Sequence, residues 1–227
     1  MNTIVIGLSG GMDSSTLLGS LLGKGNSVHC CIFKYGSKHN YHEIRAASEI
    51  IEYYNLNGYS DKIHRHDFNL SSILGSLDSA LIGDDRDVPE GHFEDEVMKQ
   101  TVVPGRNLLF ASTMASVAEN IGADKVALGV HAGDHFIYPD CRPEFIRSLN
   151  TTIYLSTDGQ VGVTAPWTKK TKADILNVGY NLDPPVPYYL TRTCYKSQAN
   201  SCGQCGACVE RLEAFKKTNH SDPILYE

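Results

Sequence analysis

Apolar residues in this chain alternate between short continuous runs and longer periodic stretches. Continuous runs are typical of strands that a parallel sheet buries on both faces. Such strand patterns occur at 3–8, 27–33 and 125–130, with a less apolar one at 61–68. Between them, apolar residues recur at the spacing of one helix face. These helices are expected over 13–25, 42–55 and 105–122.

Strands and helices that alternate with short connections predict an α/β fold, a Rossmann-like parallel sheet with right-handed crossovers. In such open sheets, ligands bind beyond the carboxyl ends of the strands. Residues 78–104 are acidic and poorly periodic, so we expect a long loop or a lid there. We divide the chain into an α/β domain over 1–185 and a small segment over 186–227 that packs on it.

Composition and charge narrow the class of protein. The chain has 227 residues, of which 41% are hydrophobic, and its net charge is −6. This charge argues against a nucleic acid as the main partner, because no global basic field draws the chain to RNA or DNA. No apolar stretch approaches the roughly 20 residues of a membrane span, and the first residues follow a strand pattern rather than that of a secretory signal. We therefore expect a cytoplasmic protein without membrane contact.

The turn after the first strand run reads LSGGMDSS and carries the groups of an anion site. Gly10 and Gly11 let backbone N–H groups approach a ligand closely, and Ser9, Ser14 and Ser15 add hydroxyl donors. The helix that starts nearby would offer its positive N-terminal end to the same anion. The plain alternative is a tight strand-to-helix turn that a side chain caps. Neither a GxxxxGK[ST] loop nor a GxGxxG fingerprint occurs at this turn.

The complete SGGMDS stretch resembles the loop of the N-type ATP pyrophosphatases. These enzymes cleave ATP between its α- and β-phosphates, keep pyrophosphate in this loop and place AMP on a substrate oxygen. Mg²⁺ is expected on the phosphates, since the loop alone cannot balance their charge. The resemblance implies that ATP is bound by Leu8, Ser9, Gly10, Gly11, Met12, Asp13, Ser14, Ser15, Thr16, Leu17 and Leu18.

Four of the seven cysteines lie close together in the C-terminal segment: Cys194, Cys202, Cys205 and Cys208. Two of the three gaps have the CxxC spacing that wraps one tetrahedral ion. Four thiolates leave no open coordination position, which favours a structural Zn²⁺. An iron–sulfur cluster or a redox-active pair is the competing interpretation of the cysteines. A zinc ribbon that binds nucleic acid is the alternative use of the segment.

Charged side chains also cluster just after the strand run at 125–130. The cluster contains Asp134, Asp140, Arg142 and Glu144. An acid that faces the N–H edge of a guanine-like base, and an arginine that faces a carboxylate, would form a substrate site there. A surface salt bridge between Asp140 and Arg142 is the structural alternative.

Five stretches follow one another along the chain: SGGMDS, VPGRN, GD-x3-YPDCRPEF, TK-A-x-I and TCY-x6-CGxCxxC. Together they resemble the 7-cyano-7-deazaguanine synthase family of queuosine biosynthesis, over about residues 3–215. The resemblance implies a carbon–nitrogen ligase that uses ATP, ammonia and 7-carboxy-7-deazaguanine, a structural zinc and a homodimer. One departure stands out: His135, Phe136 and Ile137 replace the Tyr-Ser-Gly that often precedes YPDCR in this family. This departure bears on the identity of the acid substrate.

The resemblance also assigns roles to single residues. Asp13 and Lys172 would act at the phosphates, and Arg106 of VPGRN would contact nucleotide or substrate. Lys172 could equally be a solvated helix lysine, and Arg106 could buttress its loop. The deazapurine and its carboxylate would be held by Asp134, Tyr138, Asp140 and Arg142. Alternative functions are a related ligase that stops at the amide or takes another amine or acid, and a tRNA-modifying enzyme with the same loop.

Overall fold

The computed structural model describes residues 2–83 and 85–227, and its strands form a five-stranded parallel sheet of order β3-β2-β1-β4-β5. The strands are β1 (Thr3–Gly7), β2 (Ser27–Lys34), β3 (Ile63–Asn69), β4 (Lys125–Ala127) and β5 (Gly162–Thr164). The chain leaves β1 toward β2 on one side and returns to β4 on the other, so the strand order reverses beside β1. A reversal of this kind opens a crevice at the carboxyl end of the central strand.

Seven α-helices accompany these strands in the described part of the chain. They are α1 (Met12–Gly23), α2 (Asn40–Tyr54), α3 (Ser71–Leu74), α4 (Arg106–Ile121), α5 (Pro143–Ser156), α6 (Lys172–Tyr180) and α7 (Gly206–Lys217). The shorter turns are η1 (Asn55–Tyr59), η2 (Glu96–Thr101), η3 (Ala132–His135), η4 (Pro139–Cys141) and η5 (Tyr188–Leu190). None of these helices is long and apolar enough to cross a membrane.

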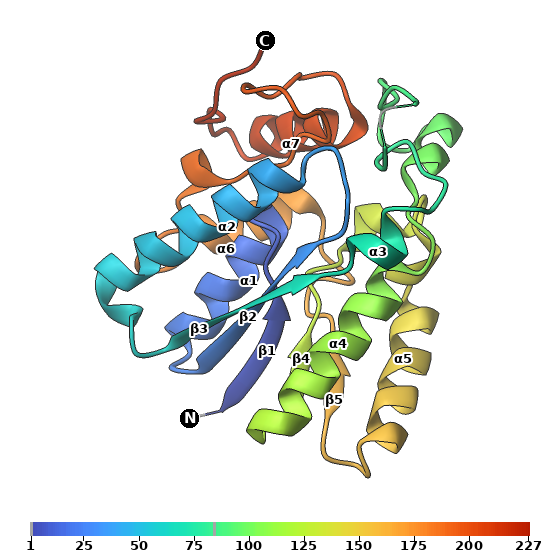
Figure 1. Ribbon diagram of the computed structural model, residues 1–227. Helices are drawn as coiled ribbons and strands as arrows, with labels where there is room; N and C mark the ends of the chain where they lie inside the picture. The colour runs from blue at the N-terminus through green and yellow to red at the C-terminus, as the bar shows by residue number, and fades with distance from the viewer. Residues whose placement is uncertain (1, 84) are drawn as a thin grey trace.

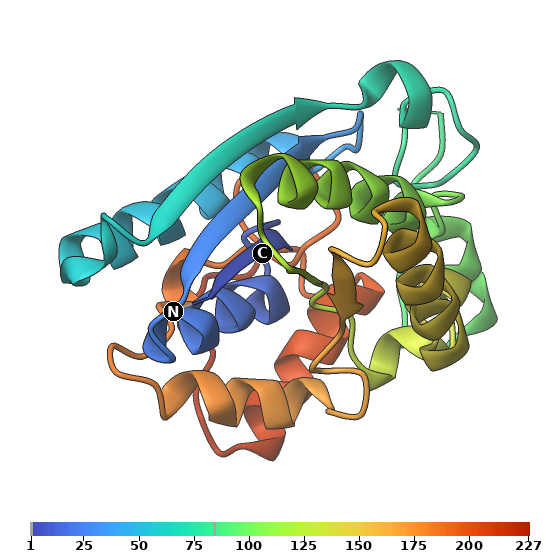
Figure 2. The same cartoon turned by 90° about the horizontal axis from the view of Figure 1, so that it is seen from below.

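Successive residues of the central strands point to opposite faces of the sheet, and both faces are covered. Val5 packs in a core with side chains of α4 and α5, whereas Ile4 and Ile6 pack with side chains of α1 and α2. Figures 1 and 2 show α4 and α5 on one side of the sheet and α1 with α6 on the other. Burial on both faces explains why β1 is a continuous apolar run in the sequence.

The predicted α/β fold is confirmed, and the seven predicted elements are present with ends that shift by a few residues. The largest shift is at 125–130, where β4 ends at Ala127 and the chain continues as an irregular segment. Leu128 still donates its N–H to Thr164 O at 2.8 Å, so the segment stays beside β5 for one more residue. The polar and glycine residues that follow build a turn at the carboxyl end of the sheet instead of extending the strand.

The C-terminal residues lie over the carboxyl ends of the strands. Figure 1 shows α7 at the end of the molecule toward which the strands point. An apolar cluster joins Met12 of α1 and Leu176 of α6 to Tyr188, Ala214 and Phe215. This cluster fixes α7 beside the start of α1; the division of the chain at residue 185 stays a prediction.

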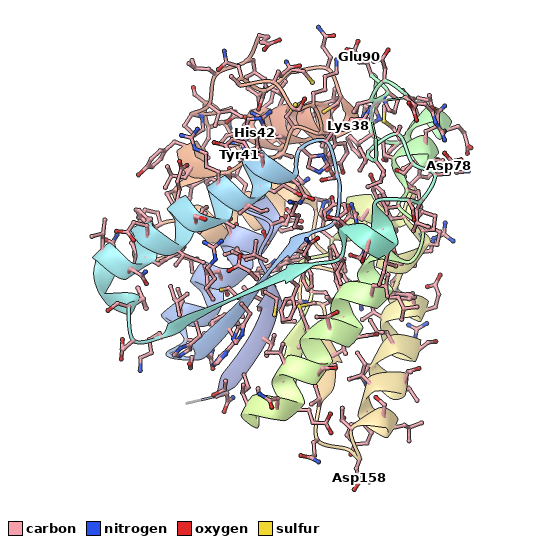
Figure 3. The ribbon with its side chains drawn as sticks, viewed as in Figure 1. Lys38, Tyr41, His42, Asp78, Glu90 and Asp158 are labelled. Carbon is pink, nitrogen blue, oxygen red and sulfur yellow. The ribbon has the colours of Figure 1, made fainter. Side chains whose placement is uncertain are left out.

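The acidic segment predicted as a loop or lid is mostly irregular, with the 3-10 turn η2 near its end. It packs against the four-cysteine segment: Gly91 donates its N–H to Gln204 O at 3.0 Å, and Glu90 forms an ion pair with Lys196. Figure 3 shows Glu90 at the same end of the molecule as the C-terminal segment. The segment therefore covers the carboxyl end of the sheet, where a ligand would bind.

Three histidines lie together near the edge of the sheet. His29 Nδ1 lies 2.8 Å from His66 Nε2, and the His29 ring stacks on that of His64 with centroids 4.4 Å apart. Burial, together with the charges that His64 and His66 carry when protonated, lowers the pKa of His29 from 6.5 to about 4. The folded state therefore keeps His29 neutral at a pH where the unfolded chain protonates it.

We expect the free energy of unfolding to fall as the pH is lowered from about 6.5 to 4, because the unfolded chain then binds more protons than the native one. His29 is partly exposed, so solvent screening reduces its contribution to about 1 kcal/mol. The variant His29→Gln is expected to remove that part of the pH dependence. Urea denaturation at pH 7 and pH 4.5 measures it, and an unchanged difference between the two pH values would contradict the assignment.

Candidate active site

A cavity of about 250 Å³ opens beyond the carboxyl end of β1. Its wall brings together the turn after β1, the starts of α1, α4 and α6, and residues of α7. Phe93 and Met98 of the acidic segment also line it. This position matches the place that the strand order predicts for a ligand.

The glycine turn presents the N-terminal end of α1 to this cavity. The N-cap of α1 is Gly11, which has no side chain that could cap the helix. The first N–H groups of α1 are therefore free to bind a ligand. Ser9 Oγ lies 3.1 Å from Ser14 Oγ, and both residues line the cavity. An exposed helix end with adjacent hydroxyl groups is a binding site for an anion such as phosphate.

Gly10 allows the turn to lie directly against α2. Its φ is +74°, and a Cβ added to it would lie 2.5 Å from Ala47 N and 2.7 Å from Ala46 Cβ. Arg192 also donates its N–H to Gly10 O at 2.9 Å, which ties the turn to the C-terminal segment. Both the conformation and the space at this position therefore require glycine.

The variant Gly10→Ala is expected to lower the free energy of unfolding by about 2–5 kcal/mol, as the positive φ and the backbone clash add. Gly25→Ala is the matched control, because Gly25 has a φ of +77° with no atom within 4 Å of an added Cβ. The control should lose only about 1–2 kcal/mol. Urea denaturation of both variants measures the free energy of unfolding. Equal losses in the two variants would show that the contact between the added Cβ and α2 does not destabilise the protein.

The eleven residues predicted to bind ATP divide into two groups in the structure. The cavity is lined by Leu8, Ser9, Gly11, Met12, Asp13 and Ser14. The remaining residues, Gly10, Ser15, Thr16, Leu17 and Leu18, lie behind the cavity wall. Thr16 Oγ1, for example, donates to Met12 O at 2.8 Å and lies 2.8 Å from Tyr188 OH, so it supports the start of α1 from inside.

A largely buried ion cluster lies beside the glycine turn, in the wall of the cavity. Lys172 Nζ lies 2.6 Å from Glu210 Oε2 and 3.4 Å from Asp13 Oδ2. Lys172 is only 7% exposed, and burial by itself would lower its pKa. The carboxylates of Asp13, Glu210 and Asp134 outweigh that effect and raise the pKa of Lys172, so it carries its charge at neutral pH.

His131 lies behind this cluster and links its acids. Its Nε2 lies 3.6 Å from Asp134 Oδ1, 3.6 Å from Glu210 Oε1 and 3.9 Å from Asp13 Oδ2. Gly133 donates its N–H to His131 Nδ1 at 3.0 Å, so a neutral His131 carries its proton on Nε2, toward the acids. Asp134 in turn accepts the His131 N–H at 3.0 Å, which fixes both side chains at the start of η3.

Arg106 also lines the cavity, where it lies among tyrosines. Its guanidinium carbon lies 6.0 Å from the ring centroid of Tyr35 and 5.7 Å from that of Tyr138. Tyr138 OH lies 2.8 Å from Thr101 Oγ1 and 3.2 Å from Tyr195 OH. Burial, followed by the charge of Glu43, raises the pKa of Tyr35 to about 12, so this phenol stays neutral.

The residues predicted to hold the substrate separate in the structure. Asp134 and Tyr138 line the cavity. Asp140 and Arg142 do not, and they form no ion pair with each other in the described part of the chain. Asp140 Oδ2 accepts the Asn107 N–H at 3.0 Å at the start of α4, and Arg142 donates Nε–H to His135 O at 3.0 Å. Both side chains stabilise the local backbone in this state.

The three residues that depart from the family pattern occupy different environments. Ile137 lines the cavity and is 4% exposed. Phe136 is 49% exposed, and His135 O accepts the bond from Arg142. Ile137 is therefore the one of the three that contributes to the wall of the cavity.

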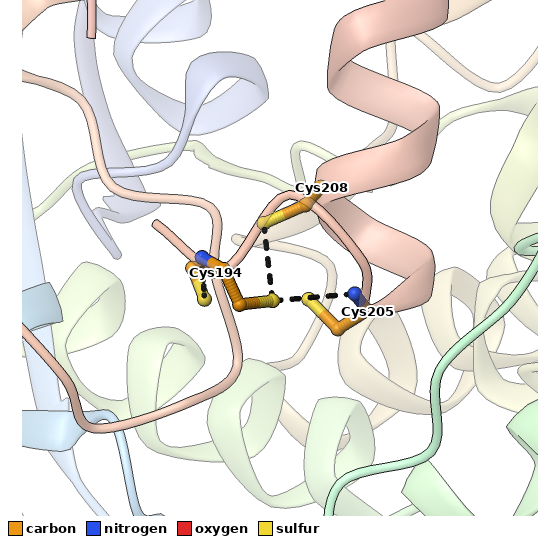
Figure 4. Close-up of side chains that lie close together, drawn as sticks. Cys194, Cys205 and Cys208 are labelled. Atoms are coloured by element: carbon orange, nitrogen blue, oxygen red, sulfur yellow. Dashed lines mark hydrogen bonds between the residues drawn. The ribbon is translucent and has the colours of Figure 1, made fainter. Parts of the chain in front are cut away.

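The four predicted metal ligands converge. The sulfur atoms of Cys194, Cys202, Cys205 and Cys208 all lie within 4.8 Å of one another, and all four residues are buried. Figure 4 shows Cys194, Cys205 and Cys208 close together near the start of α7. Backbone N–H groups of Lys196 and Cys202 donate to Cys194 Sγ at 3.4 Å, a bond that favours the thiolate. Four buried soft donors around one point fit a tetrahedral metal ion such as Zn²⁺.

Sequence reasoning missed three polar residues of the site. Glu210 on α7 and His131 before η3 carried no motif of their own. Arg192 lines the cavity and donates to Lys196 O and Gln198 O at 3.0 and 2.7 Å. Only the fold brings these side chains to the glycine turn, so no local pattern could have identified them.

Comparison with known proteins identifies the family of this chain. A family model for the queuosine biosynthesis protein QueC matches residues 3–219. A 7-cyano-7-deazaguanine synthase from Methanoregula boonei is 44% identical over 227 residues, which are 100% of both chains. A protein of the same name from Pseudoalteromonas atlantica is 40% identical over 224 residues, 99% of this chain and 98% of that protein.

A solved structure shares the fold. The NMN synthetase from Francisella tularensis superposes with a TM-score of 0.54 at 17% sequence identity, and the match covers 96% of this chain and 77% of that chain. At this identity, the likeness supports the α/β architecture alone.

Proposed function

The chain belongs to the QueC family of queuosine biosynthesis proteins, and on that premise we propose that it converts 7-carboxy-7-deazaguanine and ammonia to 7-cyano-7-deazaguanine at the expense of ATP. It is an enzyme of the carbon–nitrogen ligase type. The observation that carries the proposed chemistry is the Lys172–Asp13 ion pair at the N-terminal end of α1. It combines a fixed cation with a turn that can bind phosphates.

ATP binds with its pyrophosphate end at the glycine turn. The free N–H groups at the start of α1 and the hydroxyls of Ser9 and Ser14 contact the phosphates. Lys172 supplies positive charge to the phosphate oxygens as the bond between the α- and β-phosphates breaks. Glu210 holds Lys172 in place from the far side, and Asp13 orients it toward the turn.

The reaction needs activation twice, because neither hydroxide nor oxide is a good leaving group. The substrate carboxylate attacks the α-phosphorus, pyrophosphate leaves, and an acyl adenylate forms. Ammonia attacks the carbonyl carbon of the acyl adenylate. The bond between that carbon and the AMP oxygen breaks, AMP leaves, and the nitrogen loses a proton to give the amide. The amide oxygen then attacks the α-phosphorus of a second ATP, and pyrophosphate leaves. Loss of AMP and the remaining amide protons gives the nitrile.

Two metal ions fit the side chains of this chain. The four cysteines would hold a structural Zn²⁺, which supplies no open position for chemistry but fixes the start of α7. Asp13 Oδ1 is a buried carboxylate oxygen without a hydrogen-bond partner among the described residues, and it would bind Mg²⁺ that accompanies the phosphates. When bound, Mg²⁺ would neutralise phosphate charge.

Further properties of the protein are part of the same proposal. We place it in the cytoplasm as a homodimer whose partners are small molecules. Asp134 and Tyr138 contact the deazapurine within the cavity, whereas Asp140 and Arg142 would have to leave their present backbone partners to do so.

A mass-resolved turnover assay tests the proposed function. Purified protein with ATP, ammonium and 7-carboxy-7-deazaguanine should give the mass of the nitrile together with AMP, and Asp13→Ala should abolish both products. An amide as the final product would support the alternative of a ligase that activates its substrate once. Failure to consume the acid, with ATP bound, would overturn the substrate assignment and direct attention to Ile137 in the cavity wall.

A further inference from the structure

Arg106 is a cation of the cavity that lacks an acidic partner. No carboxylate oxygen of residues 2–83 or 85–227 lies within 4.0 Å of its guanidinium group. The remaining cations of the cavity wall are engaged: Lys172 by Glu210 and Asp13, and Arg192 by backbone carbonyls. A partly buried arginine without a counter-charge is unfavourable unless a ligand supplies one.

The surroundings of Arg106 hold it without neutralising it. Three tyrosines lie close to it. Asp140 lies farther away, and one of its carboxylate oxygens accepts the N–H of Asn107. Burial alone would lower the pKa of Arg106, but the tyrosines and the more distant Asp140 outweigh it, so the pKa is raised and the charge is permanent. Arg106 is thus a charged side chain of the cavity wall without a carboxylate partner among the described residues, which favours an anionic ligand.

The wall beside Arg106 suits a flat aromatic ligand. Phe33 and Phe110 line the cavity and stack with ring centroids 4.1 Å apart, and Tyr35 meets the Phe110 ring edge-on at 5.5 Å. Ile137 and Met114 add apolar surface. Binding sites of this kind are mostly apolar with a few polar groups that fix orientation.

We infer that Arg106 is the receptor for the carboxylate of the planar aromatic acid, which it binds through paired N–H···O bonds while the ring lies along the aromatic wall. A guanidinium matches a carboxylate in shape as well as in charge, whereas a lysine ammonium matches it in charge alone. This inference rests on the proposed function, and it replaces Arg142 in the role that the sequence assigned to it. Arg142 lies outside the cavity wall and donates to His135 O.

Isothermal titration without ATP tests the inference with two probes, 7-carboxy-7-deazaguanine and 7-cyano-7-deazaguanine. They share the ring system, but only the first has a carboxylate. Arg106→Gln should weaken binding of the acid about 100-fold, the range expected for a charge-assisted pair. Binding of the nitrile should change less than about threefold. Arg147→Gln, which removes an exposed arginine on α5, is the matched control and should leave both affinities unchanged.

Each other outcome overturns a defined part of the scheme. Equal weakening of acid and nitrile would show that Arg106 only supports the fold of the pocket, and no weakening of the acid would remove Arg106 from the site. In both cases the wild-type protein still binds the acid, so the proposed function survives. A wild-type protein that binds neither probe overturns the proposed function and the inference together.

A conservative variant keeps the test decisive if Arg106→Gln fails to fold. Arg106→Lys retains the positive charge but not the planar pair of donors. It should weaken binding of the acid about tenfold and leave binding of the nitrile unchanged. Full affinity of Arg106→Lys for the acid would overturn the paired-bond geometry.

Discussion

Replacing Lys172 by methionine is expected to lower kcat about a thousandfold. Lys172 is a fixed cation beside the glycine turn, and a preorganised group of this kind contributes about 3–4 kcal/mol to transition-state stabilisation. The variant also leaves the partly buried Asp13 and Glu210 without their cation, which should reduce the free energy of unfolding by about 2–4 kcal/mol. Steady-state kinetics and urea denaturation measure the two effects.

A second substitution separates these two effects. In the double variant Lys172→Met with Glu210→Gln, one of the unpaired acids is removed, so much of the lost stability should return while kcat stays low. Lys169→Met, an exposed lysine three residues earlier, is the control and should retain full activity. Recovery of activity in the double variant would contradict the role of Lys172 at the phosphates, since it would trace the defect to instability.

Replacing Cys205 by serine is expected to release the bound metal and abolish activity. Structural zinc contributes about 10–16 kcal/mol of binding free energy in small zinc sites, and part of this stabilises the surrounding fold. Cys205 is the N-cap of α7, the helix that carries Glu210 to Lys172. Loss of the metal should therefore disturb the active site as well as the C-terminal segment.

Elemental analysis by mass spectrometry measures this effect. Wild-type protein should contain about one zinc per chain and Cys205→Ser should contain almost none. Cys30→Ala is the matched control, because Cys30 is buried in β2, outside the cluster, and its loss should cost stability without changing the metal content. Iron with inorganic sulfide in the wild-type protein would instead support the iron–sulfur alternative, and metal-free active protein would contradict both.

The parts of this molecule that could be predicted are those whose signals are local. The run TIVIG is continuously apolar, so it predicts a buried strand without reference to the rest of the chain. The CxxC spacings likewise bring metal ligands together within a few residues. The short strand β5, by contrast, has only three residues from Gly162 to Thr164, too few to show a period. Its place in the sheet depends on pairing with β4, which the sequence around it does not encode.

The site was harder to predict because its side chains have competing partners. Asp140 and Arg142 carry suitable charges, but their geometry depends on how η4 packs against the start of α4 and on the carbonyl of His135. Glu210 and His131 come from distant elements and meet only in the folded chain. Charge and motif thus identify candidate residues, whereas the available partners decide which of them face the cavity.

The position of Glu210 also has a consequence for how the protein becomes active during synthesis. Domains fold from the N-terminal part first as the chain emerges from the ribosome. The sheet from β1 to β5 and the glycine turn are complete in a nascent chain that still lacks residues 206–217. Lys172 obtains its second acidic partner only when α7 has emerged and docked. The order of the chain therefore delays assembly of the site until α7 has been made.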